Sequence, residues 1–229
     1  MFIFDSTYLM MVFIPSLILS LLAQLFVSAA YGKWGKTRNS MGLTGVDVGE
    51  RIRRYSGLMN VQFEGIAGQL TDHYDPRSQV VRLSQDVATK PSVAAMAIVA
   101  HELGHAQQHA EKSVFMGMRN VLVPAMQFSP MVSYGLILAG LIFRVSGLLW
   151  LGIGFFAVVV GFMLLTLPVE IDASRRGLAL LHDAGLMADS QDVSGSRQVL
   201  TAAALTYVAA FITALLTLLY YISLAQDRR

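Results

Sequence analysis

Residues 93–110 read VAAMAIVAHELGHAQQHA, and this stretch decides most of what the sequence predicts. Ser92, a favoured N-cap residue, precedes a run rich in alanine and other helix-forming residues, so we predict a helix over Val93–Ala110. Apolar side chains occur on nearly every face of that helix, which indicates that most of it is buried. The side chains of His101, Glu102 and His105 lie at its centre.

The spacing of these three residues is typical of a hydrolytic zinc site. Residues four apart on a helix lie about 40° apart around the axis and one turn along, so His101 and His105 can reach one ion. Zinc lowers the pKa of a bound water to about 7, and a neighbouring carboxylate can take its proton and return it to a leaving amine. We therefore expect Zn²⁺ as the cofactor, both histidines as metal ligands and Glu102 as the catalytic general base.

The alternative is that two core histidines share this spacing by chance. Residue frequencies for 5 His in 229 residues place an accidental HExxH in fewer than about one in a hundred such chains. Burying three ionisable groups in an apolar helix is also costly unless they share a purpose. Both considerations favour the metal site.

The composition indicates a membrane protein. Of the 229 residues, 55% are hydrophobic and only 14% are charged, against about a quarter charged in soluble domains. Cysteine is absent, so a metal would be held by histidine, carboxylates and water. The formal charge of +2 is too small to indicate a nucleic-acid partner.

Four stretches with almost no charge reach the roughly 20 residues that cross a bilayer. They are Thr7–Gly32, Val121–Phe143, Val145–Val169 and Leu200–Ala225. A cleavable signal is the alternative for the first stretch, but Asp5 stands where such signals carry Lys or Arg, and the apolar run is too long. We expect all four to be membrane-spanning helices.

The predicted organisation follows from these spans. It comprises a first transmembrane helix (1–32), a soluble segment (33–120), a transmembrane hairpin (121–169), a second polar segment (170–199), and a fourth transmembrane helix with its tail (200–229). Because the chain crosses four times, both polar segments lie on the same side and can build one site.

Shorter elements are predicted within the first polar segment. Thr44 begins an amphipathic helix that stops at Gly57. Apolar residues in Asn60–Ile66 and Gln79–Ser84 predict two strands, with a turn at Tyr74–Arg77 between them. Extended substrates often add a strand to a sheet edge, and the second of these strands is the expected edge.

A catalytic zinc normally has three protein ligands, and His109 is the nearest further candidate. It lies about 12 Å along the helix axis from His101, too far for a shared ion. The extended pattern HExxHxxGxxH also fails, because Gln108 occupies its glycine position. We expect His109 to have a supporting or structural role.

Glu170 is the better third ligand, because it follows the third span on the side of the histidine helix. Pro168 just before it predicts a helix start or kink. Asp172 would then orient one histidine through its second ring nitrogen. A salt bridge from these carboxylates to Arg175 or Arg176 is the alternative.

Peptide hydrolysis also needs a donor for the developing oxyanion. His73 and Tyr74, near a predicted strand edge, and Arg175 or Arg176, just after Glu170, are the candidates. An ordinary turn and an ordinary salt-bridging pair explain these residues equally well, so none is assigned.

Three segments carry a resemblance to a known family. They are LTDHYDPR at 70–77, HELGHAQQH at 101–109 and LPVEIDASRR at 167–176, and together they resemble the bacterial YugP-type neutral zinc metallopeptidases. That family is more distantly similar to HtpX-type and CAAX prenyl proteases, in which two histidines of HExxH and a later glutamate hold zinc. The resemblance implies His101, His105 and Glu170 as ligands and Glu102 as the base. Ser174 departs from the distant relatives, which have an aspartate there.

The sequence therefore predicts a mainly α, four-span integral membrane protein with a zincin-like cap of helices and a few short strands. Its expected activity is zinc-dependent hydrolysis of peptide bonds, with a protein or peptide substrate and the lipid bilayer as partners. A regulatory membrane partner is not identified by the sequence. The competing class is a non-enzymatic metal-binding membrane protein or metal transporter, but transporters carry ionisable residues within their spans. Within the four runs and their hairpin only Arg144 is charged.

The distribution of positive charge predicts the orientation in the cell membrane. Of 17 Lys and Arg residues, only Arg144, Arg228 and Arg229 lie outside the two polar segments. Positive residues accumulate on the cytoplasmic side, so the active site is expected to face the cytoplasm.

Overall fold

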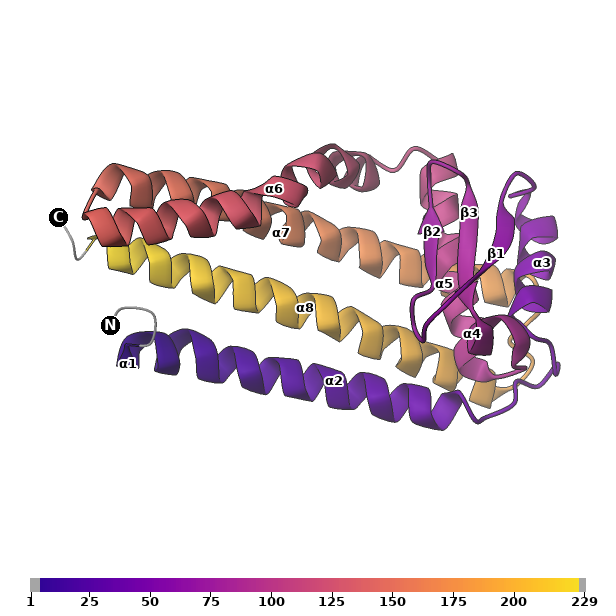
Figure 1. The fold of residues 1–229 in the computed structure, drawn as a ribbon. Helices are drawn as coiled ribbons and strands as arrows, with labels where there is room; N and C mark the ends of the chain where they lie inside the picture. The colour runs from indigo at the N-terminus through magenta and orange to yellow at the C-terminus, as the bar shows by residue number, and fades with distance from the viewer. Residues whose placement is uncertain (1–4, 227–229) are drawn as a thin grey trace. The chain divides into compact units, whose positions relative to one another are not determined.

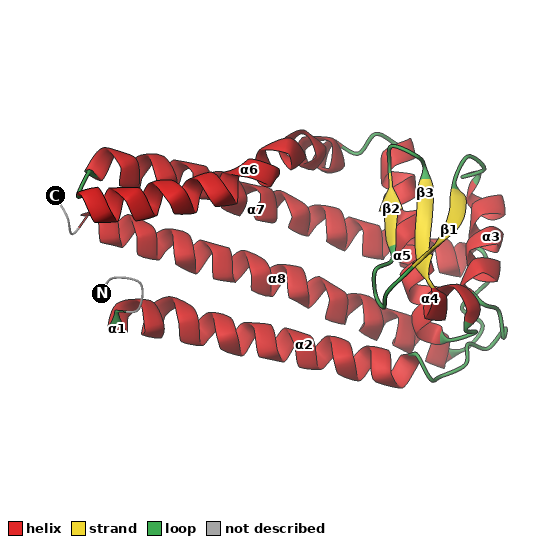
Figure 2. Cartoon of the chain, in the orientation of Figure 1, coloured by secondary structure: helices red, strands yellow, loops and turns green. Residues whose placement is uncertain are grey.

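The computed structural model describes residues 5–226, and its architecture is mainly helical (Figures 1 and 2). The predicted orientation of Arg228 and Arg229 lies outside the described residues. Within residues 5–226, four helical stretches are long and apolar enough to span a membrane, which confirms the four predicted spans. They are Ser6–Trp34, formed by α1 (Ser6–Tyr8), a π-helical turn (Leu9–Phe13) and α2 (Ile14–Trp34); α6 (Val114–Phe143); α7 (Ser146–Asp183); and α8 (Ser190–Gln226).

Helix α7 continues well past the predicted end of the third span. Pro168 lies inside α7, so the predicted helix start at this residue is wrong. Proline removes one backbone N–H, but the apolar residues before it and the helix-forming residues after it keep one continuous helix. As a result Glu170 projects from the same helix that forms the third span.

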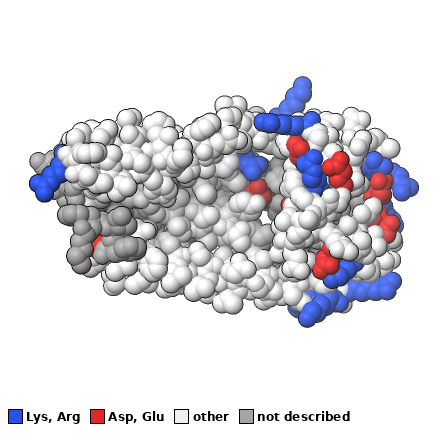
Figure 3. Space-filling model, in the orientation of Figure 1, with Lys and Arg blue, Asp and Glu red and all other residues white. Residues whose placement is uncertain are grey.

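The chain divides into two compact units. One holds the described parts of Met1–Ala23, Gly117–Pro168 and Leu205–Arg229, and its small cores contain side chains such as Ile153 and Phe156. The other holds Gln24–Met116 and Val169–Ala204. The two polar segments, far apart in sequence, therefore contribute to one compact unit. On the face drawn in Figure 3, acidic and basic side chains gather over its strands and the helix α3 (Gly45–Ser56).

The core of this second unit is built around α5 (Val93–Ala110). Ser92 caps its start, since the Ser92 side chain accepts a hydrogen bond from the backbone N–H of Ala95. Most residues of α5 are buried, and Met96, Val99 and Leu103 are among the largest fully buried side chains. The predicted bounds, cap and burial of this helix are confirmed.

Helix α3 (Gly45–Ser56) also begins and ends as predicted. Thr44 and Asp47 form a capping box, in which each side chain accepts a hydrogen bond from the other residue's backbone N–H. Gly57 ends the helix with φ of 73°, a left-handed conformation that glycine adopts without strain. Helix α4 (Gln85–Thr89) is a short connection before α5.

The sheet differs from the prediction. It contains β1 (Gln62–Ile66), β2 (His73–Asp75) and β3 (Val80–Ser84) in the order β1-β3-β2, with β1 parallel and β2 antiparallel to β3. The prediction of a turn at Tyr74–Arg77 is wrong for Tyr74 and Asp75, which belong to β2.

Strand β3 is the centre of the sheet, so the prediction that Gln79–Ser84 is an edge is also wrong. Val80, Val81 and Leu83 are all buried, as expected of a strand covered on both faces. The edges are β1 and β2. The edge strand β2 contacts α5, which brings its backbone to the histidine helix.

Helices α5 and α7 approach closely because two glycines face the partner backbone. A Cβ atom at Gly104 would clash with the carbonyl oxygen of Ala173, and one at Gly177 would lie 2.8 Å from that of Ala100. The glycine of HELGH is thus a packing residue that lets Glu170 approach the two histidines.

We predict that Gly104→Ala lowers the free energy of unfolding by about 1–3 kcal/mol, because the added methyl group must separate the two helices. Gly161→Ala, also within a helix but with no atom within 4 Å of the new Cβ, is the matched control and should be neutral or stabilising. Thermal unfolding in detergent measures both. Equal melting temperatures for the two variants would contradict this account of the packing.

Candidate metal centre and active site

The structure brings together all three predicted metal ligands. One donor atom from each of His101, His105 and Glu170 lies within 4.8 Å of the others. Glu170 Oε2 is 3.3 Å from His101 Nε2 and 3.6 Å from His105 Nε2. The two imidazole rings have centroids 4.7 Å apart and meet edge to face. Two turns of α5 and one turn of α7 therefore point three donors at a common point.

The environment of Glu170 fits a metal ion. The residue is only 3% exposed, and its buried Oε2 atom makes no hydrogen bond that meets ordinary geometry among the described residues; its polar neighbours are the Nε2 atoms of the two histidines. Burying an ionised carboxylate carries a large desolvation cost, which a cation bound between these atoms would offset. Two imidazole nitrogens and a carboxylate oxygen are a donor set that Zn²⁺ takes in catalytic sites.

The electrostatic environment of His105 also favours a positive charge in the site. Burial opposes the charged imidazolium, but the contact with Glu170 and the negative charges of Glu102 and Glu170 outweigh burial and raise the pKa of His105. The site therefore favours positive charge in its interior. A divalent cation bound there would replace the proton at the histidine.

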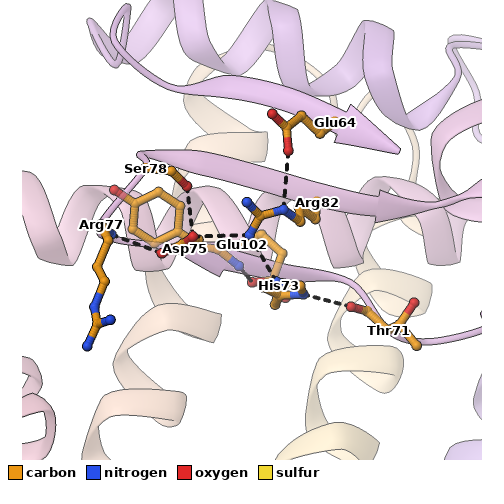
Figure 4. Close-up of polar contacts among 9 residues, drawn as sticks. Glu64, Thr71, His73, Asp75, Arg77, Ser78, Arg82 and Glu102 are labelled. Atoms are coloured by element: carbon orange, nitrogen blue, oxygen red, sulfur yellow. Dashed lines mark hydrogen bonds and ion pairs between the residues drawn. The ribbon is translucent and has the colours of Figure 1, made fainter. Parts of the chain in front are cut away.

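Glu102 lies on α5 beside this cluster, and its carboxylate contacts β2. The residue is 7% exposed, and its Oε2 accepts a hydrogen bond from the backbone N–H of Tyr74, with N and O 2.8 Å apart. Figure 4 shows Glu102 next to β2, between His73 and Asp75. The edge strand and the candidate general base are thus in direct contact.

The position of β2 is maintained by a polar network on the sheet (Figure 4). Arg82 of β3 forms ion pairs with Glu64 of β1 and Asp75 of β2, at 3.2 and 3.1 Å. Hydrogen bonds from the Ser78 hydroxyl, the Arg77 backbone N–H and Arg82 lower the pKa of Asp75 to about 2. Asp75 is therefore ionised at neutral pH, and Arg82 links all three strands.

The predicted direct contact between Asp172 and a histidine is wrong. Asp172 contacts neither histidine; its Oδ2 accepts a hydrogen bond from Gln108, whose own oxygen lies 3.0 Å from His105 Nδ1. Gln108 is a contact of this cluster that the sequence did not predict. Its position three residues after His105 on one helix face was the available signal.

The alternative of a salt bridge holds for Asp172 but not for Glu170. Asp172 pairs with Arg176 at 2.7 Å, and Arg176 also pairs with Glu111 at 2.6 Å. Glu170 pairs with the two histidines. The other histidine of the cluster, His101, has the hydroxyl of Ser174 3.2 Å from its Nδ1.

The remaining candidates have partners of their own. The hydroxyl of Tyr74 lies 2.9 Å from Nδ1 of His109, and Nδ1 of His73 lies 2.9 Å from the carbonyl oxygen of Thr71. His109 does not join the cluster of three donors, as the helix geometry predicted. No oxyanion donor is assigned from these contacts.

Comparisons with known proteins agree with this site. The family model described as "Putative neutral zinc metallopeptidase" matches residues 9–226. The chain is 39% identical over 216 residues to the "Putative membrane protease YugP" of Bacillus subtilis (strain 168), and the match covers 94% of this chain and 96% of that protein. No solved structure matches the chain significantly. The chain therefore belongs to the neutral zinc metallopeptidase family, as a multi-pass membrane hydrolase that uses zinc.

Proposed function

We propose that this enzyme is a membrane-embedded zinc endopeptidase with His101, His105 and Glu170 as metal ligands and Glu102 as the general base. The observation that carries the proposal is the convergence of the buried Oε2 of Glu170 with the Nε2 atoms of His101 and His105. A bound Zn²⁺ would supply Lewis acidity, polarising a peptide carbonyl and acidifying a water.

Glu102 is suited to move the proton of that water. The Tyr74 N–H holds one carboxylate oxygen, so the carboxylate has a defined orientation beside the metal ligands. We assign the second oxygen to accepting the proton and delivering it to the leaving amine. This is an acid–base role that does not require Glu102 to bind the metal.

We propose a protein or peptide substrate that lies along the β2 edge. The N–H of Tyr74 points from β2 toward Glu102, away from the pairing with β3, so this edge borders the reacting groups. Tyr74 also lines a cavity of about 270 Å³. Its lining contains no Asp, Glu, Lys or Arg: Gly57, Leu58, Asn60, Val61, Tyr74, Gln79, Ala106, His109 and Ala110. An uncharged substrate side chain fits this lining, since a buried unpaired charge is costly.

We further propose that the segments 33–120 and 170–199 face the cytoplasm. Lys33, Lys36 and Arg38 follow the first span directly, and Arg175 and Arg176 closely follow the third. Positive residues close to span ends are those that determine orientation.

Replacing Glu102 by Gln should abolish hydrolysis and retain zinc. The amide oxygen can still accept the hydrogen bond from Tyr74, but the amide cannot take a proton, and loss of a general base typically costs about 10²- to 10⁴-fold in rate. The measurements are casein or peptide hydrolysis and elemental analysis of the purified protein. A Glu102→Gln protein with full activity would disprove the mechanism.

Glu170→Ala should lose both zinc and activity, whereas His109→Ala should retain at least part of the zinc. The first substitution removes one of three donors, and the second removes a residue whose ring contacts Tyr74. Elemental analysis of both variants, purified identically, tests the assignment. The opposite pattern would mean that His109 is the ligand and Glu170 is not.

Single cysteines test the orientation, because the native chain has no cysteine. A membrane-impermeant thiol reagent applied to intact cells should label Ser146→Cys and Gln226→Cys but not Ser113→Cys or Ser194→Cys. Labelling of the last two positions in permeabilised cells is the control for reactivity. Labelling of Ser113→Cys from outside would reverse the proposed orientation.

A further inference from the structure

The side chain of Gln108 connects the two helices that carry the metal donors. It is fully buried, at 0% exposed. Its Oε1 lies 3.0 Å from His105 Nδ1 on α5. Its Nε2 donates to the backbone oxygen of Val169 at 2.8 Å and to Oδ2 of Asp172 at 2.7 Å, both on α7. One carboxamide thus uses both of its ends, one on each helix.

The partners of Gln108 determine which way its amide group points. The backbone oxygen of Val169 is only an acceptor, and the carboxylate of Asp172, which also accepts from Arg176, is an acceptor as well. The group that faces both must be the NH₂, so the amide oxygen faces His105. An amide oxygen cannot donate, and therefore His105 Nδ1 carries the proton.

In the neutral imidazole, which carries a single proton, this arrangement leaves Nε2 of His105 as the unprotonated nitrogen. Nε2 is the atom that lies 3.6 Å from Glu170 Oε2, within the cluster of three donors. Only an unprotonated imidazole nitrogen can bind a metal ion. At His101 the corresponding contact is the hydroxyl of Ser174, which can donate or accept and so imposes no tautomer.

The second end of Gln108 acts on the other ligand. Val169 directly precedes Glu170, so the bond from Gln108 to its carbonyl oxygen holds the turn of α7 from which Glu170 projects. Asp172 is held in turn by Arg176, at 2.7 Å. The amide group therefore couples the position of His105 to that of Glu170.

We infer that Gln108 is a positioning residue for the metal site, which sets the tautomer of His105 and the spacing between His105 and Glu170. The inference rests on the proposed ligand assignment. Gln108 does not touch the reacting atoms; it acts through the two ligands. Loss of such outer partners typically weakens metal binding by about 10- to 100-fold.

Two substitutions distinguish the role of the amide oxygen of Gln108 from that of its NH₂ group. Gln108→Leu removes both, so at a pH where His105 is neutral the metal-free protein should show a mixture of His105 tautomers, and zinc affinity should fall by about 10- to 100-fold. Gln108→Glu keeps an acceptor for His105 but loses the donor and places a second carboxylate beside Asp172. It should keep the tautomer and still lose zinc affinity.

Adding Asp172→Asn to Gln108→Glu supplies a new amide donor toward the new carboxylate, and zinc affinity should recover. This pair also keeps the test decisive if Gln108→Leu does not fold. Gln107→Leu is the matched control, because the half-buried Gln107 side chain makes no hydrogen bond in the part of the chain that the structure describes. Gln107→Leu should change neither the tautomer of His105 nor the zinc affinity.

The measurements are nitrogen NMR of histidine-labelled, metal-free protein in detergent and zinc affinity by competition with a chromophoric chelator. An unchanged His105 tautomer and unchanged zinc affinity in folded Gln108→Leu protein would overturn the inference. So would a double variant that binds zinc no better than Gln108→Glu. If instead the unaltered enzyme binds no zinc, the ligand assignment fails, whereas the tautomer of His105 still reports on Gln108.

Discussion

A buried carboxylate facing two imidazoles is the interaction on which the rest of the structure depends. Glu170 comes from α7, the histidines come from α5, and Oε2 of Glu170 lies between their Nε2 atoms. An ionised carboxylate in a buried environment is stable only when positive charge lies beside it. The packing of the two helices must therefore hold the donors close enough for one cation to neutralise that charge.

The features around the site serve this requirement. Gly104 and Gly177 have no side chain where the backbones of α5 and α7 come together, which permits the short approach. The burial of Val99 and Leu103 on α5 supplies apolar packing around the ionisable groups. Gln108 then satisfies its own hydrogen-bonding groups by joining the two helices, as a fully buried amide must. Apolar packing and hydrogen bonding therefore both hold Glu170 close to the two histidines.

The other side of the site is set by the sheet. Strand β2 is short and polar, and it is held in place by pairing with β3 and by Arg82, which reaches both outer strands. Its contribution to the site is a backbone N–H that binds Glu102. A backbone donor is well suited to this task, because the strand fixes its direction and no side-chain entropy is lost in using it.

The sequence by itself determined the features that depend on neighbouring residues. A capping serine and an apolar run predict α5; Thr44 and Gly57 predict the two ends of α3; and uninterrupted apolar stretches predict the four spans. The HExxH spacing follows from helix periodicity alone, so it predicts His101, Glu102 and His105 as site residues without knowledge of the fold.

Only the tertiary structure decided the features that depend on partners distant in the chain. The three residues of β2, His73–Asp75, have no apolar pattern. They form a strand because β3 pairs with them. Pro168 has the local signature of a helix start, but the surrounding residues keep α7 continuous. The path from Asp172 to His105 runs through Gln108, which lies 64 positions from Asp172 in the sequence. Hydrogen bonds of this kind are set by how the helices pack, and no local pattern in the sequence encodes them.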